Sequence, residues 1–105
     1  MRLEGNCKLL KIYLNEDSKY KGHALYHAVV LKLKELGLAG ATVSRGIEGF
    51  GQKKRLHSAR ILDLSLSLPV IIETIDSEEK IIKAAEHLKG MLEEGLMFIT
   101  DVRVI

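Results

Sequence analysis

The sequence has almost none of the cysteines that stabilise small folds through disulfides or metal sites. Its 105 residues include a single cysteine, Cys7, so the chain can form no internal disulfide and no cysteine-based zinc site. A chain of this length buries roughly 65% of its unfolded surface and needs no such stabilisation. We therefore expect a single domain over residues 1–105, with Cys7 as a buried, unreactive thiol.

Aromatic residues, proline and long apolar runs are also scarce. Tryptophan is absent, aromatics make up 5% of the chain, and Pro69 is the only proline. No apolar run approaches the roughly 18 residues of a membrane span, and residues 1–6 lack the apolar stretch of a signal peptide. The net charge of +2 is too small to indicate a nucleic-acid or membrane surface. We expect a soluble, cytoplasmic protein that inserts into no membrane.

The sequence does contain a regular succession of strand-like and helix-like segments. Strands are predicted at residues 8–14, 41–45, 70–75 and 96–105. Helices are predicted at residues 23–36 and from 77 to about 90, where apolar residues recur at helical spacing. The order predicts an α+β, ferredoxin-like βαββαβ domain. It would have a four-stranded antiparallel sheet, two helices on one face, and a long loop between the second and third strands.

Two finer structural predictions follow from the same pattern. Asp76, with Glu79 three residues later, resembles a capping box, so Asp76 is predicted as the N-cap of the second helix. The face of the sheet without helices would be half apolar, which favours oligomerisation over ligand binding by that face. The residues assigned to it are Leu9, Lys11, Tyr13 and several of Met97, Ile99, Asp101 and Arg103.

Catalytic and metal-binding patterns are weak. His23 and His27 have the i, i+4 spacing by which two imidazoles on a helix share a metal ion, but the glutamate of the zinc-protease motif is missing. Both also lie off the apolar arc of the helix, so two solvated histidines are the simpler interpretation. No group of residues assembles a nucleophile, a base and an oxyanion site, and we expect no enzymatic activity and no bound metal.

The segment after the second predicted strand is rich in glycine and cations. Gly49-Phe50-Gly51 is followed by Gln52-Lys53-Lys54-Arg55. In the RNA-recognition motif the Gly-aromatic-Gly element belongs to the third strand and more aromatics follow, so RNA binding is not favoured here. Glycine amides with nearby cations can bind a phosphate. On the residues alone, an anion site and a solvated basic hairpin both remain open.

A family resemblance bears on this choice. Residues 40–51, GATVSRGIEGFG, resemble the segment of PII signalling proteins that runs from their second strand into the long T-loop. Residues 101–104 are similar to the arginine-containing final strand of that family. The stretches 12–16, 22–26 and 68–73 resemble a divergent PII-like group without settled function.

The resemblance implies a specific kind of protein. PII proteins are homotrimers that bind adenine nucleotides in clefts between subunits, where a T-loop base and a second loop, the B-loop, close on the phosphates. It implies a nucleotide-ordered loop, residues 49–62, presented to an unidentified target protein. The implied nucleotide-binding residues are Gly49, Phe50, Gly51, Gln52, Lys53, Gly95, Leu96, Met97 and Arg103.

Departures from the family pattern refine the ligand. Gln52-Lys53 replaces Arg-Gln, and the B-loop is shortened to residues 93–95, whose two acids would repel a triphosphate. ADP, AMP or a different effector is therefore expected before tight binding of Mg-ATP. Residues 50–60 contain no tyrosine, so the family's uridylylation is not expected.

Two other functions remain open at this stage. One is a metal-responsive trimer similar to divalent-cation tolerance proteins, with His23, His27 or His57 meeting across subunits. The other is an interaction module that binds no ligand.

Overall fold

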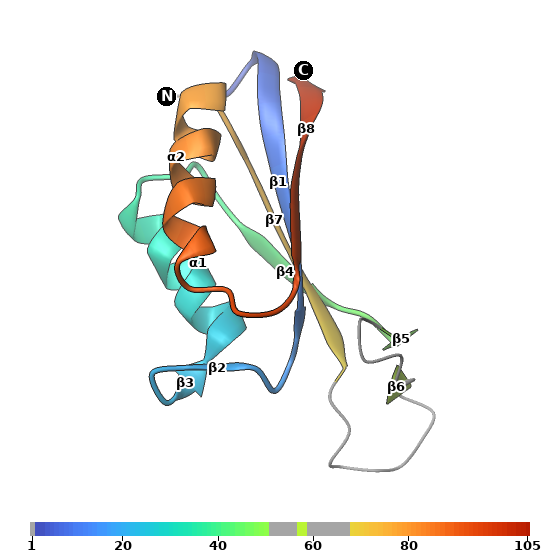
Figure 1. Ribbon diagram of the computed structural model, residues 1–105. Helices are drawn as coiled ribbons and strands as arrows, with labels where there is room; N and C mark the ends of the chain where they lie inside the picture. The colour runs from blue at the N-terminus through green and yellow to red at the C-terminus, as the bar shows by residue number, and fades with distance from the viewer. Residues whose placement is uncertain (1, 51–56, 59–67) are drawn as a thin grey trace.

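The computed structural model describes residues 2–50, 57–58 and 68–105. Helices α1 and α2 lie on one face of a four-stranded antiparallel sheet with strand order β4-β7-β1-β8 (Figure 1). The strands are β1 (Gly5–Asn15), β2 (Lys19–Tyr20), β3 (His23–Ala24), β4 (Thr42–Arg45), β5 (Glu48–Gly49), β6 (His57–Ser58), β7 (Pro69–Asp76) and β8 (Leu96–Val104), and the helices are α1 (Leu25–Glu35) and α2 (Glu78–Lys89). The predicted ferredoxin-like α+β fold is confirmed. The small pairs β2–β3 and β5–β6 are additions that the sequence pattern did not predict.

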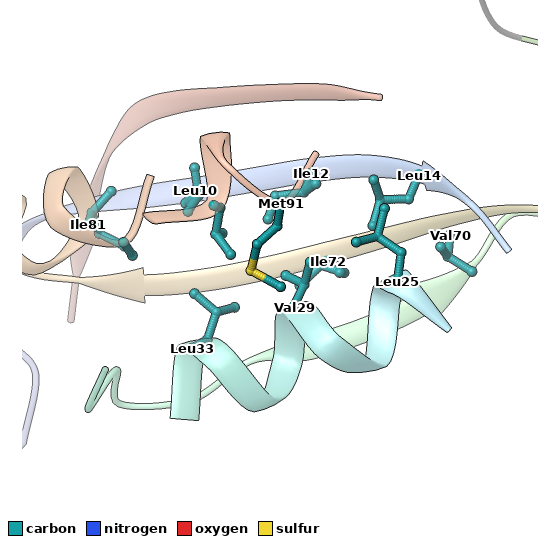
Figure 2. Packing of buried hydrophobic residues seen from close by; sticks show 12 residues of the cluster. Leu10, Ile12, Leu14, Leu25, Val29, Leu33, Val70, Ile72, Ile81 and Met91 are labelled. Carbon is teal, nitrogen blue, oxygen red and sulfur yellow. The ribbon is translucent and has the colours of Figure 1, made fainter. Parts of the chain in front are cut away.

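The hydrophobic core lies between the sheet and the two helices (Figure 2). Alternate residues of the two central strands point toward the helices, and each helix contributes one apolar stripe, as predicted. The buried members of this cluster are Leu10, Ile12, Leu14, Leu25, Val29, Leu33, Val70, Ile72, Ile81, Ala84, Leu88 and Met91. Cys7 is also buried and free, as expected. Among the described residues, no helix is long and apolar enough to cross a membrane.

The start of α2 differs from the prediction. The N-cap is Ser77, whose hydroxyl accepts a hydrogen bond from the Lys80 amide at 3.4 Å. Asp76 is instead the last residue of β7 and is buried. Its carboxylate accepts hydrogen bonds from the Ala39 amide at 2.8 Å and the Ser77 amide at 2.7 Å. The capping-box prediction was wrong because a main-chain donor distant in sequence engages this carboxylate.

The face of the sheet that no helix covers, called the open face below, differs in composition from the prediction. Leu9, Lys11 and Tyr13 lie on it, as predicted, because their neighbours in β1 face the helices. In the antiparallel register, Tyr13 pairs with Leu96 and Lys11 with Phe98. Directly paired residues share a face, so even-numbered residues of β8 lie on the open side. The predicted members Met97, Ile99, Asp101 and Arg103 therefore lie on the helix side.

Candidate functional site

The predicted nucleotide-binding residues fall into separate segments of the fold. Gly51, Gln52 and Lys53 lie outside the described residues. The others occupy three places: Gly49 and Phe50 follow β4, Gly95 with Leu96 and Met97 opens β8, and Arg103 stands near the end of β8. Their positions decide which of them one chain can bring together.

The first segment leaves the edge strand β4 and passes close to Pro69. The Gly46 amide donates a hydrogen bond to the Pro69 carbonyl at 2.7 Å. A Cβ atom on Gly46 would lie 2.7 Å from Cγ of Pro69, and one on Gly49 would lie 3.3 Å from it. This backbone therefore packs against the proline ring at a separation that a side chain would increase. Phe50, the next described residue, is 70% exposed.

The second segment is the turn from α2 into β8. Gly95 has a φ of +110°, a conformation that glycine adopts without strain. A Cβ atom here would lie 2.6 Å from the Tyr13 carbonyl oxygen, so the turn lies directly on the end of β1. Leu96 is exposed, and Met97 packs against the core. Met97 also lines an open groove of about 290 Å³ between α2 and β8, which includes neither Gly95 nor Gly49.

The two glycine segments lie at the same end of the sheet, on opposite edges. One row of paired residues runs across all four strands, through Leu96, Tyr13, Ile71 and Ser44. Three strand spacings separate its ends, about 14 Å. In Figure 1 the α2–β8 connection and β5 both lie toward the end of the sheet opposite the two termini.

Arg103 lies near the other end of the sheet. It pairs with Asn6, whereas Leu96 pairs with Tyr13. Seven residues of strand separate Arg103 from Leu96, about 24 Å at the usual rise. A single chain therefore does not bring Arg103 next to either glycine segment.

One residue at this end of the sheet was missed by the sequence analysis. Glu16 follows β1, and its Oε2 accepts hydrogen bonds from Arg45 Nη2 at 2.8 Å and Nε at 3.1 Å. The same oxygen lies 3.4 Å from the Leu68 amide nitrogen. These partners are distant from Glu16 in sequence: Arg45 ends β4, and Leu68 directly precedes β7. No local motif signals such a contact, and only the strand register reveals it.

The histidines lie in separate elements of the described structure. His23 belongs to β3, whereas His27 lies within α1, so the two do not share a helical face as the i, i+4 spacing suggested. His57 lies in β6. Within residues 2–50, 57–58 and 68–105, no group of three or more His, Cys, Asp or Glu residues is placed to hold a metal ion.

Comparison with known proteins gives the family. The model of the DUF190 family, described as "Uncharacterized ACR, COG1993", matches residues 7–104. The chain belongs to the DUF190 family. A UPF0166 protein of Aquifex aeolicus (strain VF5) is 43% identical over 98 residues, which cover 93% of this chain and 92% of that protein. The fold of this DUF190 chain is that of PII-like proteins.

Two solved structures illustrate the fold of this DUF190 chain. CPII from Thiomonas intermedia K12 is a nitrogen regulatory PII-like protein whose structure is bound to ADP, AMP and bicarbonate. It superposes with a TM-score of 0.72 at 20% identity, covering 94% of this chain and 88% of CPII. The divalent ion tolerance protein CutA1 from Ehrlichia chaffeensis superposes with a TM-score of 0.63 at 11% identity, over 93% and 82% of the two chains. At these identities the likeness shows the fold alone.

Proposed function

We propose that this DUF190 chain is a non-enzymatic PII-like sensor that binds an adenine nucleotide between subunits of a homotrimer. The nucleotide would order the loop of residues 49–62, which would then engage or release a target protein. The observation that carries the proposal is the placement of the two glycine segments. Both approach neighbouring backbone or proline atoms too closely for an unstrained Cβ, and both lie at one end of a PII-like sheet.

The separation of the predicted residues supports a site shared between copies of the chain. Arg103 lies about 24 Å along β8 from Leu96, the residue after Gly95, so Gly95 and Arg103 belong to one phosphate site only if different protomers supply them. The open face also carries apolar side chains, among them Phe98 and Ile75, that a partner copy would cover. The adenine nucleotides bound to CPII support the ligand class.

The choice among nucleotides rests on charge. Glu93 and Glu94 directly precede Gly95 and are exposed. Two carboxylates beside a phosphate site disfavour a further negative charge. ADP and AMP are therefore proposed as the effectors, with ATP bound more weakly.

Calorimetric titration with ADP, AMP, ATP and cyclic AMP, together with native mass spectrometry, tests this function. We expect calorimetry to show one ADP bound per protomer and native mass spectrometry to show an assembly of three chains. Absence of heat with every nucleotide would refute the nucleotide-sensor function, and a monomeric mass would refute the shared site.

A matched glycine pair makes the test specific. Gly95→Ala forces the turn away from the Tyr13 carbonyl, whereas Gly37→Ala has a similar positive φ of +81° but no atom within 4 Å of the added Cβ. Both variants carry the cost of a left-handed alanine. Losing one main-chain hydrogen bond to phosphate costs about 1.5–3 kcal/mol, a tenfold or larger loss of affinity. We expect that loss for Gly95→Ala and not for Gly37→Ala. Equal ADP affinities of the two variants would contradict the proposed site.

The likeness to CutA1 supports a metal-responsive trimer as a second candidate, because both proteins share this fold. His23 and His27 would then meet ligands from neighbouring copies. Metal analysis of the purified protein, followed by titration of His27→Ala with a divalent cation, separates the two functions. A cation that binds to the unsubstituted chain and not to His27→Ala, without any nucleotide heat, would favour this candidate.

A further inference from the structure

Glu16 connects three parts of the chain through one side chain and its own backbone. Its Oε2 accepts from both the Nε and Nη2 atoms of Arg45, at 3.1 and 2.8 Å, and from the Leu68 amide at 3.4 Å. The Glu16 amide donates to the Leu68 carbonyl at 2.9 Å. A charged acceptor with several donors forms stronger bonds than a neutral pair. Glu16 therefore holds the end of β4 and the start of β7 against the end of β1.

These contacts stand directly next to the first glycine segment. Arg45 precedes Gly46, and Leu68 precedes Pro69, whose carbonyl accepts from the Gly46 amide at 2.7 Å. The ring of the same proline is the surface against which Gly46 and Gly49 pack. Displacement of Arg45 or Leu68 relative to β1 would consequently shift the glycine backbone.

The same stretch of β1 also contacts the second glycine segment. Gly95 lies against the carbonyl of Tyr13, three residues before Glu16. The two glycine segments are on opposite edges of the sheet and are linked by this central strand. The end of β1 therefore contacts both glycine segments of the predicted site, one directly and the other through Glu16.

We propose that Glu16 is a positioning residue for the nucleotide site, acting through Arg45 and Leu68 without touching the ligand. This inference rests on the proposed function. In this role Glu16 fixes the position of the site and adds little to the stability of the fold. The Arg45 side chain is 60% exposed, and an exposed ion pair adds little to the stability of a fold. Its removal should therefore change affinity for ADP more than it changes unfolding.

Glu16→Gln tests this role while preserving the size of the side chain. We expect ADP to bind between about fivefold and tenfold more weakly in calorimetry, the usual size of a coupling that acts through intermediate residues. The thermal unfolding midpoint should change little. Glu35→Gln is the matched control, because Glu35 forms an exposed ion pair with Lys32 at 3.0 Å on α1. It should leave the affinity unchanged.

A double-mutant cycle separates positioning from a general loss of charge. If Glu16 acts through Arg45, Glu16→Gln combined with Arg45→Met should bind ADP no more weakly than the worse single variant. Additive losses would overturn the inference, because Arg45 would then contribute independently of Glu16.

Hydrogen exchange adds a readout that needs no ligand. Glu16→Gln should accelerate exchange of the Leu68 and Gly46 amides, and Glu35→Gln should not. Unchanged exchange, or ADP affinity equal to that of the unsubstituted chain, would overturn the role of Glu16 while leaving the proposed function intact. No binding of ADP by the unsubstituted chain would instead overturn the proposed function, and the positioning role with it.

Discussion

The two faces of the four-stranded sheet differ in what covers them. On the helix side, Ile72 is fully buried and Asp76 nearly so. On the opposite side of the same strand, Glu73 is partly exposed and Ile75 is 36% exposed. The first face is closed by the chain's own helices, whereas the second carries apolar and charged residues with no helix over them (Figure 1). The helix side therefore determines the fold, and the open side is where a partner copy would add stability.

The open face has an organised surface of its own. The rings of Tyr13 and Phe98 stack at 6.3 Å with an angle of 26° between their planes. Lys11 Nζ lies 5.7 Å from the centre of the Tyr13 ring, and Lys11 pairs across the strands with Glu73. Charged residues beside aromatic rings suit an interface that excludes only part of its water.

Replacing the same residue type on both faces of β7 gives the largest expected effect. Ile72→Ala should lower the free energy of unfolding by about 2–5 kcal/mol, because it removes a fully buried side chain from the core. Ile75→Ala should cost about 1 kcal/mol, since its side chain already meets water in the single chain. Urea denaturation of both variants measures the difference.

Protein concentration provides a second test of the difference between the two faces. If copies pack through the open face, the cost of Ile75→Ala should grow as the assembly forms, whereas that of Ile72→Ala should not depend on concentration. Equal costs for the two variants at low concentration would contradict the distinction between the faces.

How far the sequence predicts these faces depends on the strand. In β1 the alternation of Leu10 and Ile12 with Lys11 predicts the correct side for residues 9–14. In β8 the run Leu96-Met97-Phe98-Ile99 is apolar on both sides, so alternation cannot choose, and the prediction was wrong by one residue.

The candidate site was predictable only where a motif is local. The glycines at 49 and 95 follow from the family resemblance; Gly95 lies against the Tyr13 carbonyl, and Gly49 against the ring of Pro69. The contacts of Asp76 with Ala39 and of Glu16 with Arg45 were not predictable, because each joins residues distant in sequence whose proximity depends on the finished sheet. Propensity and spacing carry no signal for such pairs.

Replacing a carboxyl group on either face of β7 should have an intermediate effect on the free energy of unfolding. Asp76→Asn leaves one carbonyl oxygen for the amides of Ala39 and Ser77, and a part-buried donor without its partner costs about 1–3 kcal/mol. Glu73→Gln on the open face should change the free energy of unfolding by no more than about 0.5 kcal/mol. Chemical denaturation near neutral pH checks both values. A loss for Glu73→Gln as large as that for Asp76→Asn would show that the open face depends on its charge as strongly as the helix side does.

Replacing either of two lysines of β1 should have the smallest effect on the free energy of unfolding, and the pH dependence of that effect should differ between them. The hydrogen bond from Lys8 to Asp101 raises the pKa of Lys8 above its ordinary value of 10.5, and Glu78 adds to the shift. A raised folded-state pKa stabilises the fold fully below 10.5, and this contribution is lost as the pH rises through the folded value. Lys8→Met should therefore reduce the fall in unfolding free energy on the alkaline side, measured by urea denaturation from neutral pH upward. Lys11→Met, on the open face, keeps the Lys8 contact and should retain that fall; the same flattening in both variants would contradict the assignment to Lys8.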